Sequence, residues 1–190
     1  MPMIKILCFM MVGLLTACGN MADDLNPSGN DLRPSVVANS IGSSPTQVLA
    51  DFSAPKTTAD SFTLSDYLAG GAQASDAIVF YFTMWCPICM SHGDHILYNI
   101  MPQFQGRGTV RYVLIDYVSG SIAATTTSEA ANGYTGSPFI VLADINQALL
   151  TQLQGAMGKT IVLDSNGIVL MNEDFRTGDH LISTLDNLLP

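Results

Sequence analysis

Apolar stretches alternate with mixed polar and apolar stretches from about residue 77 to the end of the chain. Ile78–Thr83 is a continuous apolar run, which is typical of a central strand buried on both faces. Val110–Tyr117 and the shorter Phe139–Leu142 have the same character. These runs predict three strands, and the intervals between them are long enough to hold helices.

The intervals carry apolar residues at helical spacing. Pro87 to about Met101 begins with a proline, a residue that suits the first position of a helix. Apolar side chains then recur at Ile88, Ile96, Leu97 and Ile100. Further helices are predicted at Ile122–Asn132, Ile145–Leu153 and Asp179–Leu189.

A hairpin is predicted near the end of the chain. Thr160–Leu163 and Ile168–Asn172 flank Asp164–Gly167, in which Asn-Gly signals a tight turn. Alternating strands and helices, followed by a hairpin and a last helix, predict an α/β fold. Its central mixed sheet would carry helices on both faces, in three layers.

The first fifty residues lack this alternation. A basic start and the apolar run Ile6–Leu15 predict a secretory signal peptide over residues 1–17. It ends in Leu15-Thr16-Ala17-Cys18-Gly19, which resembles the bacterial lipobox, whose cysteine is lipidated; the alternative is an ordinary signal peptide with an incidental cysteine. Residues 18–50, rich in Asn, Ser, Gly and Pro, predict a lipidated N-terminus and flexible tether. Residues 51–190 remain for one domain.

This start predicts an extracytoplasmic protein, lipid-anchored to a membrane through Cys18. Gly19, in place of aspartate, resembles the outer-membrane sorting rule, so in a Gram-negative host the domain would face the periplasm. In a host with one membrane, the anchor would lie on its outer face.

The charge of the chain restricts its partners. After the predicted cleavage site, basic residues occur only at Arg33, Lys56, Arg107, Arg111, Lys159 and Arg176. All sixteen acidic residues remain, so the mature protein carries about ten net negative charges. Such a surface repels nucleic acid and anionic lipid, so no nucleic-acid partner is expected and the acyl group must hold the membrane.

The cysteines point to redox or metal chemistry. Cys8 leaves with the signal peptide and Cys18 carries lipid, so Cys86 and Cys89 are the only thiols left. A lone CxxC in an exported protein is either a redox pair or part of a metal site. Trp85-Cys86-Pro87-Ile88-Cys89 follows a strand and begins a helix, and a helix N-terminus stabilises a thiolate.

Five segments in order resemble the thioredoxin fold. They are Asp51–Pro55, Phe62–Tyr67, Phe80–Cys89, Phe139–Asp144 and Ile161–Val169. The nearest branch is similar to the exported TlpA/ResA-like thiol–disulfide oxidoreductases of cytochrome c maturation, which grade into the peroxiredoxin-like (AhpC/TSA) superfamily.

The resemblance implies a membrane-anchored thiol–disulfide oxidoreductase with a thioredoxin-like three-layer sandwich. Cys86 would be the nucleophile and Cys89 the more buried resolving thiol. No cofactor is implied beyond the redox-active disulfide. The implied partners are thiols and disulfides of exported proteins, together with a membrane or periplasmic redox partner.

The chain also departs from that family. Met157-Gly158 stands where a cis-proline loop would face the disulfide, which alters the docking surface for substrates and makes metal binding less implausible. Phe80 replaces the carboxylate that many thioredoxins bury six residues before the first cysteine. His92 replaces the acid that some maturation-branch members carry three residues after the second cysteine. Trp85, Pro87 and Ile88 complete the expected neighbours of the pair.

Several roles stay open at this stage. His92 shares a helix face with Cys89 and is interpreted as a proton acceptor, as a metal ligand with Cys86 and Cys89, or as a helical histidine without special function. Trp85 is either a lid over the disulfide or a core aromatic at the end of a strand. Thr83 partly matches the Thr-x-x-Cys spacing of peroxiredoxins, and the alternative is a residue at the end of a strand.

The alternatives to an oxidoreductase are copper or other metal binding, thiol peroxidase activity, and a non-catalytic module with a static disulfide. No dedicated metal site is predicted. The sequence does not distinguish a reductase from an oxidase.

Overall fold

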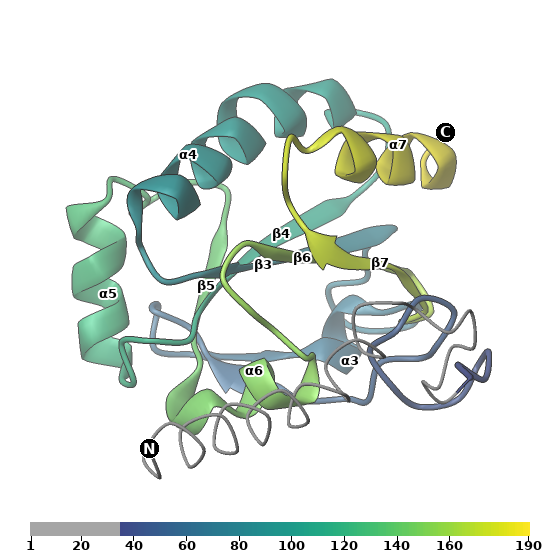
Figure 1. The fold of residues 1–190 in the computed structure, drawn as a ribbon, viewed down its shortest axis with the longest axis horizontal. Helices are drawn as coiled ribbons and strands as arrows, with labels where there is room; N and C mark the ends of the chain where they lie inside the picture. Colours follow the sequence, from purple (N-terminus) through teal and green to yellow (C-terminus); the bar gives the residue numbers. More distant parts are fainter. Residues whose placement is uncertain (1–34) are drawn as a thin grey trace, which may run out of the picture. The chain divides into compact units, whose positions relative to one another are not determined.

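A five-stranded mixed sheet forms the centre of the computed structural model, which describes residues 35–190 (Figure 1). In spatial order the strands are β5 (Ile140–Ala143), β4 (Val110–Asp116), β3 (Ala77–Thr83), β6 (Lys159–Asp164) and β7 (Val169–Asp174). β5, β4 and β3 run parallel, whereas β6 and β7 pair antiparallel. The predicted signal peptide, Cys18 and most of the predicted tether lie outside the described residues.

The central strand β3 is buried on both faces. Ile78, Phe80 and Phe82 point to one side of the sheet, and Ala77, Val79 and Tyr81 point to the other. This alternation follows from the two-residue period of a strand. β3 is apolar along its whole length because other elements cover both faces of the sheet, as predicted.

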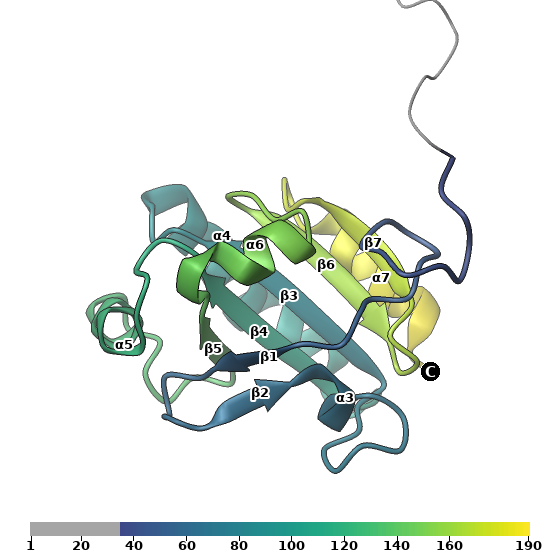
Figure 2. The ribbon, with the colours of Figure 1, turned by 90° about the horizontal axis from the view of Figure 1, so that it is seen from below.

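Helices cover both faces of the sheet. On the face of Tyr81 lie α4 (Pro87–His95), a π-helical segment η1 (Ile96–Ile100), a 3-10 segment η2 (Met101–Phe104) and α7 (Asp179–Leu188). Figure 2 shows the opposite face, covered by the hairpin of β1 (Ser53–Pro55) and β2 (Ser61–Thr63), by α3 (Leu64–Tyr67) and by η3–α6 (Ile145–Gln147 and Ala148–Gln152). α5 (Ile122–Ala131) lies beside β5.

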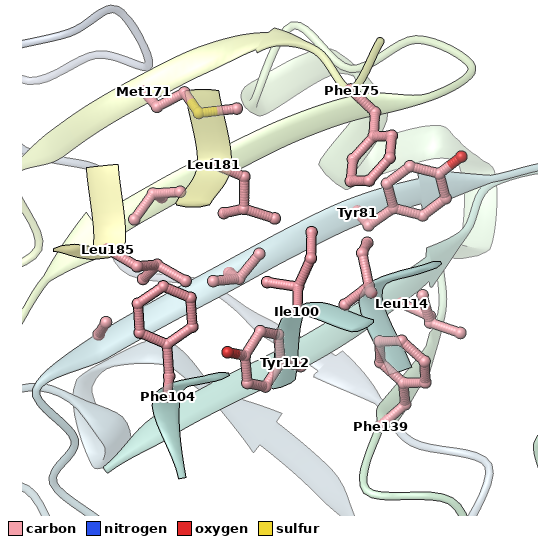
Figure 3. Packing of buried hydrophobic residues seen from close by; sticks show 14 of the residues in the cluster. Tyr81, Ile100, Phe104, Tyr112, Leu114, Phe139, Met171, Phe175, Leu181 and Leu185 are labelled. Carbon is pink, nitrogen blue, oxygen red and sulfur yellow. The ribbon is translucent and has the colours of Figure 1, made fainter. Parts of the chain in front are cut away.

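The larger apolar cluster lies between the sheet and the helices α4 and α7. Figure 3 shows Ile100, Leu181 and Leu185 directed at the sheet, where each is fully buried. Each such side chain stabilises the fold by about 1.5–3 kcal/mol relative to exposure. Tyr81 lies at one end of this cluster, beside Phe175.

The strands and helices predicted from apolar patterning are confirmed, with bounds that differ by a residue or two. The helix predicted over Pro87–Met101 is helical throughout, but it widens to a π-helix at Ile96. The β1–β2 hairpin is the main element without a predicted counterpart, because three-residue strands are too short to show a period of two. Among residues 35–190, no helix is both long and apolar enough to cross a bilayer.

The N-terminal segment of the described chain is paired with both outer strands of the sheet. At the β7 side, the N–H of Thr46 donates to Val169 O (2.8 Å), and the N–H of Leu49 donates to Gly167 O (2.9 Å). At the β5 side, the N–H of Thr57 donates to Val141 O (3.1 Å). Figure 2 shows the chain passing between these two edges through β1.

This pairing bears on the N-terminal boundary of the domain, which is predicted from the sequence at residue 51. The tether was expected to reach residue 50, but residues 39–50 are hydrogen-bonded and Leu49 is buried. Val48 and Leu49 are isolated apolar residues in a polar stretch, and backbone pairing holds such a stretch without apolar periodicity. The domain therefore begins before residue 51.

Candidate active site

The turn from β3 into α4 presents the first cysteine at a helix N-terminus. After Thr83, Trp85 adopts a left-handed backbone conformation with φ of 59°, and its N–H donates to Thr83 Oγ1 (3.0 Å). Pro87 occupies the first turn of α4, and Cys86 caps the helix. A proline at this position sacrifices no helical hydrogen bond. The local sequence is thus sufficient to place Cys86 where helix N–H groups converge.

Cys86 is the accessible thiol of the pair. It is half-buried, and its Sγ accepts a hydrogen bond from the N–H of Cys89 (3.2 Å). Partial burial opposes ionisation, but hydrogen bonds from the Cys89 thiol and from the N–H groups of Cys89 and Ile88 outweigh it and lower the pKa of Cys86. This environment favours the thiolate, which is the attacking form.

Cys89 has the opposite environment. It lies one helical turn inside the fold and is 2% exposed. Burial, followed by the hydrogen bond with Cys86, raises the pKa of the Cys89 thiol. Both cysteines are free thiols in this structure. The two thiols therefore differ in exposure and in the direction in which their pKa values are shifted.

The Met157-Gly158 loop faces the pair. Met157 Sδ lies 3.7 Å from Cys86 Sγ, and the Met157 side chain is 46% exposed. The N–H of Gly158 donates to Phe82 O (3.0 Å), and the N–H of Phe175 donates to Gly158 O (2.9 Å), so the loop is fixed to the sheet. The structure thus brings Met157 and Gly158, which were predicted as neighbours of the pair, to the side of Cys86 and Cys89.

A cavity of about 230 Å³ opens beside Cys89. Ile88, which is exposed on the first turn of α4, forms one wall, and Met157 and Gly158 form another. Tyr81, His92 and the exposed residues Asp174 and Arg176 also line it. The cavity therefore combines apolar, aromatic and charged side chains beside Cys89.

His92 and Tyr81 are connected by a hydrogen bond of 3.0 Å between Nδ1 and the phenol oxygen. Burial, followed by the proximity of His95, lowers the pKa of His92, so the imidazole is neutral near neutral pH. Burial raises the pKa of Tyr81, and the charge of Cys89 and a hydrogen bond with its thiol add to the effect. The Tyr81 hydroxyl thus bonds His92 in a cavity that Cys89 also lines.

His92 does not join the cysteines as a ligand set. Across residues 35–190, no three histidine, cysteine or acidic side chains are placed to hold a metal ion together. The His92 ring instead packs on Phe175, with 4.6 Å between ring centroids. Its position fits a proton acceptor better than a metal ligand.

Trp85 packs at the edge of the main core rather than standing free. Its ring is tilted against that of Tyr134, with 6.2 Å between centroids, and its indole N–H is buried without a partner. The Tyr134 hydroxyl donates in turn to Asp94 on α4 (2.8 Å). These contacts match the core-aromatic interpretation of Trp85.

Three aromatic residues of the site were not among the predicted site residues. Tyr81 could have been found, because its position in β3 points it to the same side as the helix that carries Cys89. Tyr134 and Phe175 had no local signal, since they come from loops distant in sequence. Thr83 is buried and accepts the N–H of Trp85, as expected of a strand-end residue.

Comparison with known proteins adds structural but no sequence relatives. No protein-family model and no curated protein matches the chain. Peroxidoxin BcpB from Mycobacterium tuberculosis is 18% identical, with a TM-score of 0.59 over 75% of this chain and 96% of that protein. A thioredoxin-like protein from Aeropyrum pernix is 15% identical, with a TM-score of 0.55 over 72% and 89% of the two chains. A secreted Mycobacterium tuberculosis disulfide oxidoreductase homologous to E. coli DsbE is 14% identical, with a TM-score of 0.53 over 72% and 96%.

These neighbours share the architecture built up above. This chain has a mixed sheet in the order β5-β4-β3-β6-β7, with helices on both faces. One of these helices, α4, begins at the CxxC pair. The domain has a thioredoxin-like fold.

Proposed function

We propose that this protein is an extracytoplasmic thiol–disulfide oxidoreductase that uses Cys86 and Cys89 as its redox pair. The observation that carries the proposal is the asymmetry of the two thiols. Cys86 is accessible and its pKa is lowered, whereas Cys89 is buried and its pKa is raised. Exchange needs such an asymmetry, because one sulfur must attack the substrate and the other must stay protonated until the mixed disulfide has formed.

In the reducing direction, the Cys86 thiolate attacks one sulfur of a substrate disulfide. A mixed disulfide forms, and the other substrate sulfur leaves as a thiolate. Cys89 then loses its proton and attacks Cys86 Sγ, which closes the Cys86–Cys89 disulfide and releases the second substrate thiolate. Two electrons pass from the pair to the substrate, and the same steps in reverse oxidise a dithiol.

The second step needs an acceptor for the Cys89 proton. The Tyr81 hydroxyl, which lines the same cavity as Cys89, accepts it while passing its own proton to Nδ1 of His92 along the hydrogen bond between them. A free tyrosinate is avoided because the pKa of Tyr81 is raised. Tyr81 and His92 thus do the work for which other members of this fold use a buried carboxylate.

The test uses the full chain with Cys8 and Cys18 replaced by serine, so that only the pair can react. This protein should reduce or isomerise disulfides of a model substrate, and Cys86→Ser should abolish the activity. Cys89→Ser should accumulate a mixed disulfide on Cys86, detected by mass spectrometry. A pair that never cycles between dithiol and disulfide would contradict the proposal.

Thiol peroxidase activity is the second candidate, favoured by the fold shared with Peroxidoxin BcpB. Peroxide consumption in the presence of a thiol donor tests it. Thr83 is only 2% exposed, so its hydroxyl is not accessible to a peroxide that arrives from solvent. We expect slow consumption relative to disulfide exchange.

The anchoring proposal rests on the sequence of the first nineteen residues. A lipid on Cys18 would hold the domain on the membrane surface, where it meets exported thiol and disulfide substrates and a membrane or periplasmic redox partner. Incorporation of labelled fatty acid in the expressing host should be lost in Cys18→Ser. Labelling that persists in this variant would contradict the anchor.

A further inference from the structure

Three sulfur atoms converge at the N-terminus of α4. Cys86 Sγ lies 3.7 Å from Met157 Sδ and accepts the backbone N–H of Cys89 (3.2 Å), and Cys89 and Met157 line the same cavity. The exchange mechanism uses the two thiols but gives the thioether no task. The backbone beside Met157 is nevertheless held in place, because its neighbour Gly158 is hydrogen-bonded to Phe82 in β3 and to Phe175 just after β7.

The distance between these sulfurs suits a shared metal ion. Three sulfur ligands at about 2.3 Å from an ion in their plane lie about 4 Å from one another. The separation of 3.7 Å between Cys86 and Met157 is close to this value. Only small side-chain movements are therefore needed to bring both atoms onto one ion.

The kinds of ligand select the kind of metal. Two thiolates and a thioether form a soft set, which favours Cu(I) over the harder divalent ions. His92 is not counted in this set, because no three histidine, cysteine or acidic side chains among residues 35–190 are placed to hold a metal ion together. The ion would lie at the entrance of the cavity beside Cys89, where Met157 is partly exposed and gives access from solvent.

We infer that the reduced protein binds one Cu(I) ion through Cys86, Cys89 and Met157. Binding replaces the remaining thiol protons with the metal and transfers no electrons, so it needs no oxidant or reductant. The dithiol form binds the ion and the disulfide form does not. The inference stands independently of disulfide exchange, because it needs only that the pair exists as free thiols, as in this structure.

The test titrates the full chain, with Cys8 and Cys18 replaced by serine, with Cu(I) bound to bicinchoninate under anaerobic conditions in mild detergent. We expect one Cu(I) per reduced chain and none for the oxidised protein. Met157→Leu keeps the size and apolar character of the side chain but removes the sulfur, and should weaken binding at least about tenfold. Met84→Leu is the matched control, because Met84 is also exposed and lies near the pair in sequence. Its affinity should not change.

Spectroscopy separates the third ligand from a folding effect. In protein labelled with selenomethionine, X-ray absorption at the copper edge should show two sulfur neighbours and one selenium neighbour. This label leaves the fold intact, and the selenium signal should disappear in Met157→Leu and persist in Met84→Leu.

Four results would overturn the site. They are unchanged affinity in Met157→Leu, absence of a selenium neighbour, a loss in Met84→Leu equal to that in Met157→Leu, and a loss in His92→Gln greater than that in Met157→Leu. Disulfide exchange is measured on the same variants. Exchange without copper binding refutes this inference alone, and copper binding without exchange refutes the proposed oxidoreductase alone.

Discussion

The two thiols of the CxxC pair differ because one helical turn carries Cys86 from the surface into the core at Cys89. Cys86 gains hydrogen bonds that favour its thiolate, whereas Cys89 loses contact with water. Two residues of the same type thus differ in how readily their thiols ionise, which is the difference that the proposed disulfide exchange requires. Their difference should be measurable directly.

Alkylation of the reduced protein should show two separate pH dependences. Because the pKa of Cys86 is lowered, its thiolate persists to lower pH than that of a free cysteine, whose pKa is about 8.5. Cys89, with its raised pKa, should react only at higher pH. Iodoacetamide rates for each peptide, followed by mass spectrometry between pH 5 and pH 10, measure both. Equal profiles for the two cysteines would contradict the assignment of attacking and resolving thiols.

Removing the Tyr81 hydroxyl should slow the resolving step and leave the first attack unchanged. Tyr81→Phe keeps the ring but breaks the connection between Cys89 and His92. Loss of assisted proton transfer is expected to slow release of a trapped mixed disulfide about a hundredfold. Stopped-flow measurement of both steps tests this.

Tyr112→Phe is the matched control for Tyr81→Phe. Tyr112 is a buried tyrosine on the same side of the sheet, and its hydroxyl has no hydrogen-bond partner. It should leave both steps unchanged. If Tyr81→Phe and Tyr112→Phe behave alike, the relay through Tyr81 is wrong.

At the scale of elements, Gly93 in α4 leaves the space that the side chain of Tyr134 occupies. A Cβ atom at Gly93 would lie 2.6 Å from the hydroxyl oxygen of Tyr134, which is closer than real Cβ contacts. The same hydroxyl bonds Asp94 on that helix. The loop after α5 is thus joined to the helix of the active site through Tyr134.

Gly93→Ala should therefore destabilise the protein, and the cost should depend on Tyr134. Overpacking is expected to lower the free energy of unfolding by about 1–3 kcal/mol. In the Tyr134→Phe background the nearest ring atom is at 3.2 Å, so most of the cost should vanish. An alanine in a helix is otherwise about 1 kcal/mol better than glycine. Urea unfolding of the four proteins of this double-mutant cycle measures the coupling, and equal costs in both backgrounds would refute it.

The elements that could be predicted from the sequence are those with a local pattern. The β3 run and the proline at the start of α4 determine the position of Cys86, and the hairpin register placed Met157 opposite it. The π-helical turn of η1 has no such pattern, because Ile96 and Ile100 fit an α-helix as well. The contacts of Tyr134 and Phe175 form only when distant elements pack, so the sequence carried no signal for them, whereas the place of Tyr81 in β3 indicates the side of the sheet to which it points.

At the scale of the whole molecule, residues 36–50 belong to the folded domain. Leu49 is buried in the cluster below the sheet, and its backbone is paired with the turn before β7. These residues therefore contribute to the stability of the domain.

Truncation should locate the start of the domain. A chain beginning at Val36 should unfold at the same urea concentration as the longer protein, whereas one beginning at Asp51 should lose at least about 2 kcal/mol, the burial of one leucine. Leu49→Ala should cost about 2–5 kcal/mol in the longer chain. Val37→Ala, at a side chain that is 64% exposed, is the control and should have no effect. Equal stability of the two truncated chains would return the boundary to residue 51.

The pairing of one N-terminal stretch with both outer strands also bears on how copies of the chain meet. A strand with unsatisfied N–H and C=O groups along its outer side can recruit a strand from another molecule. Here the beginning of β7 is occupied by residues 46–49, and the middle of β5 is occupied by Lys56 and Thr57. Residues 46–57 therefore prevent another chain from adding a strand at these positions of β7 and β5. This pairing should reduce aggregation through the edges of the sheet.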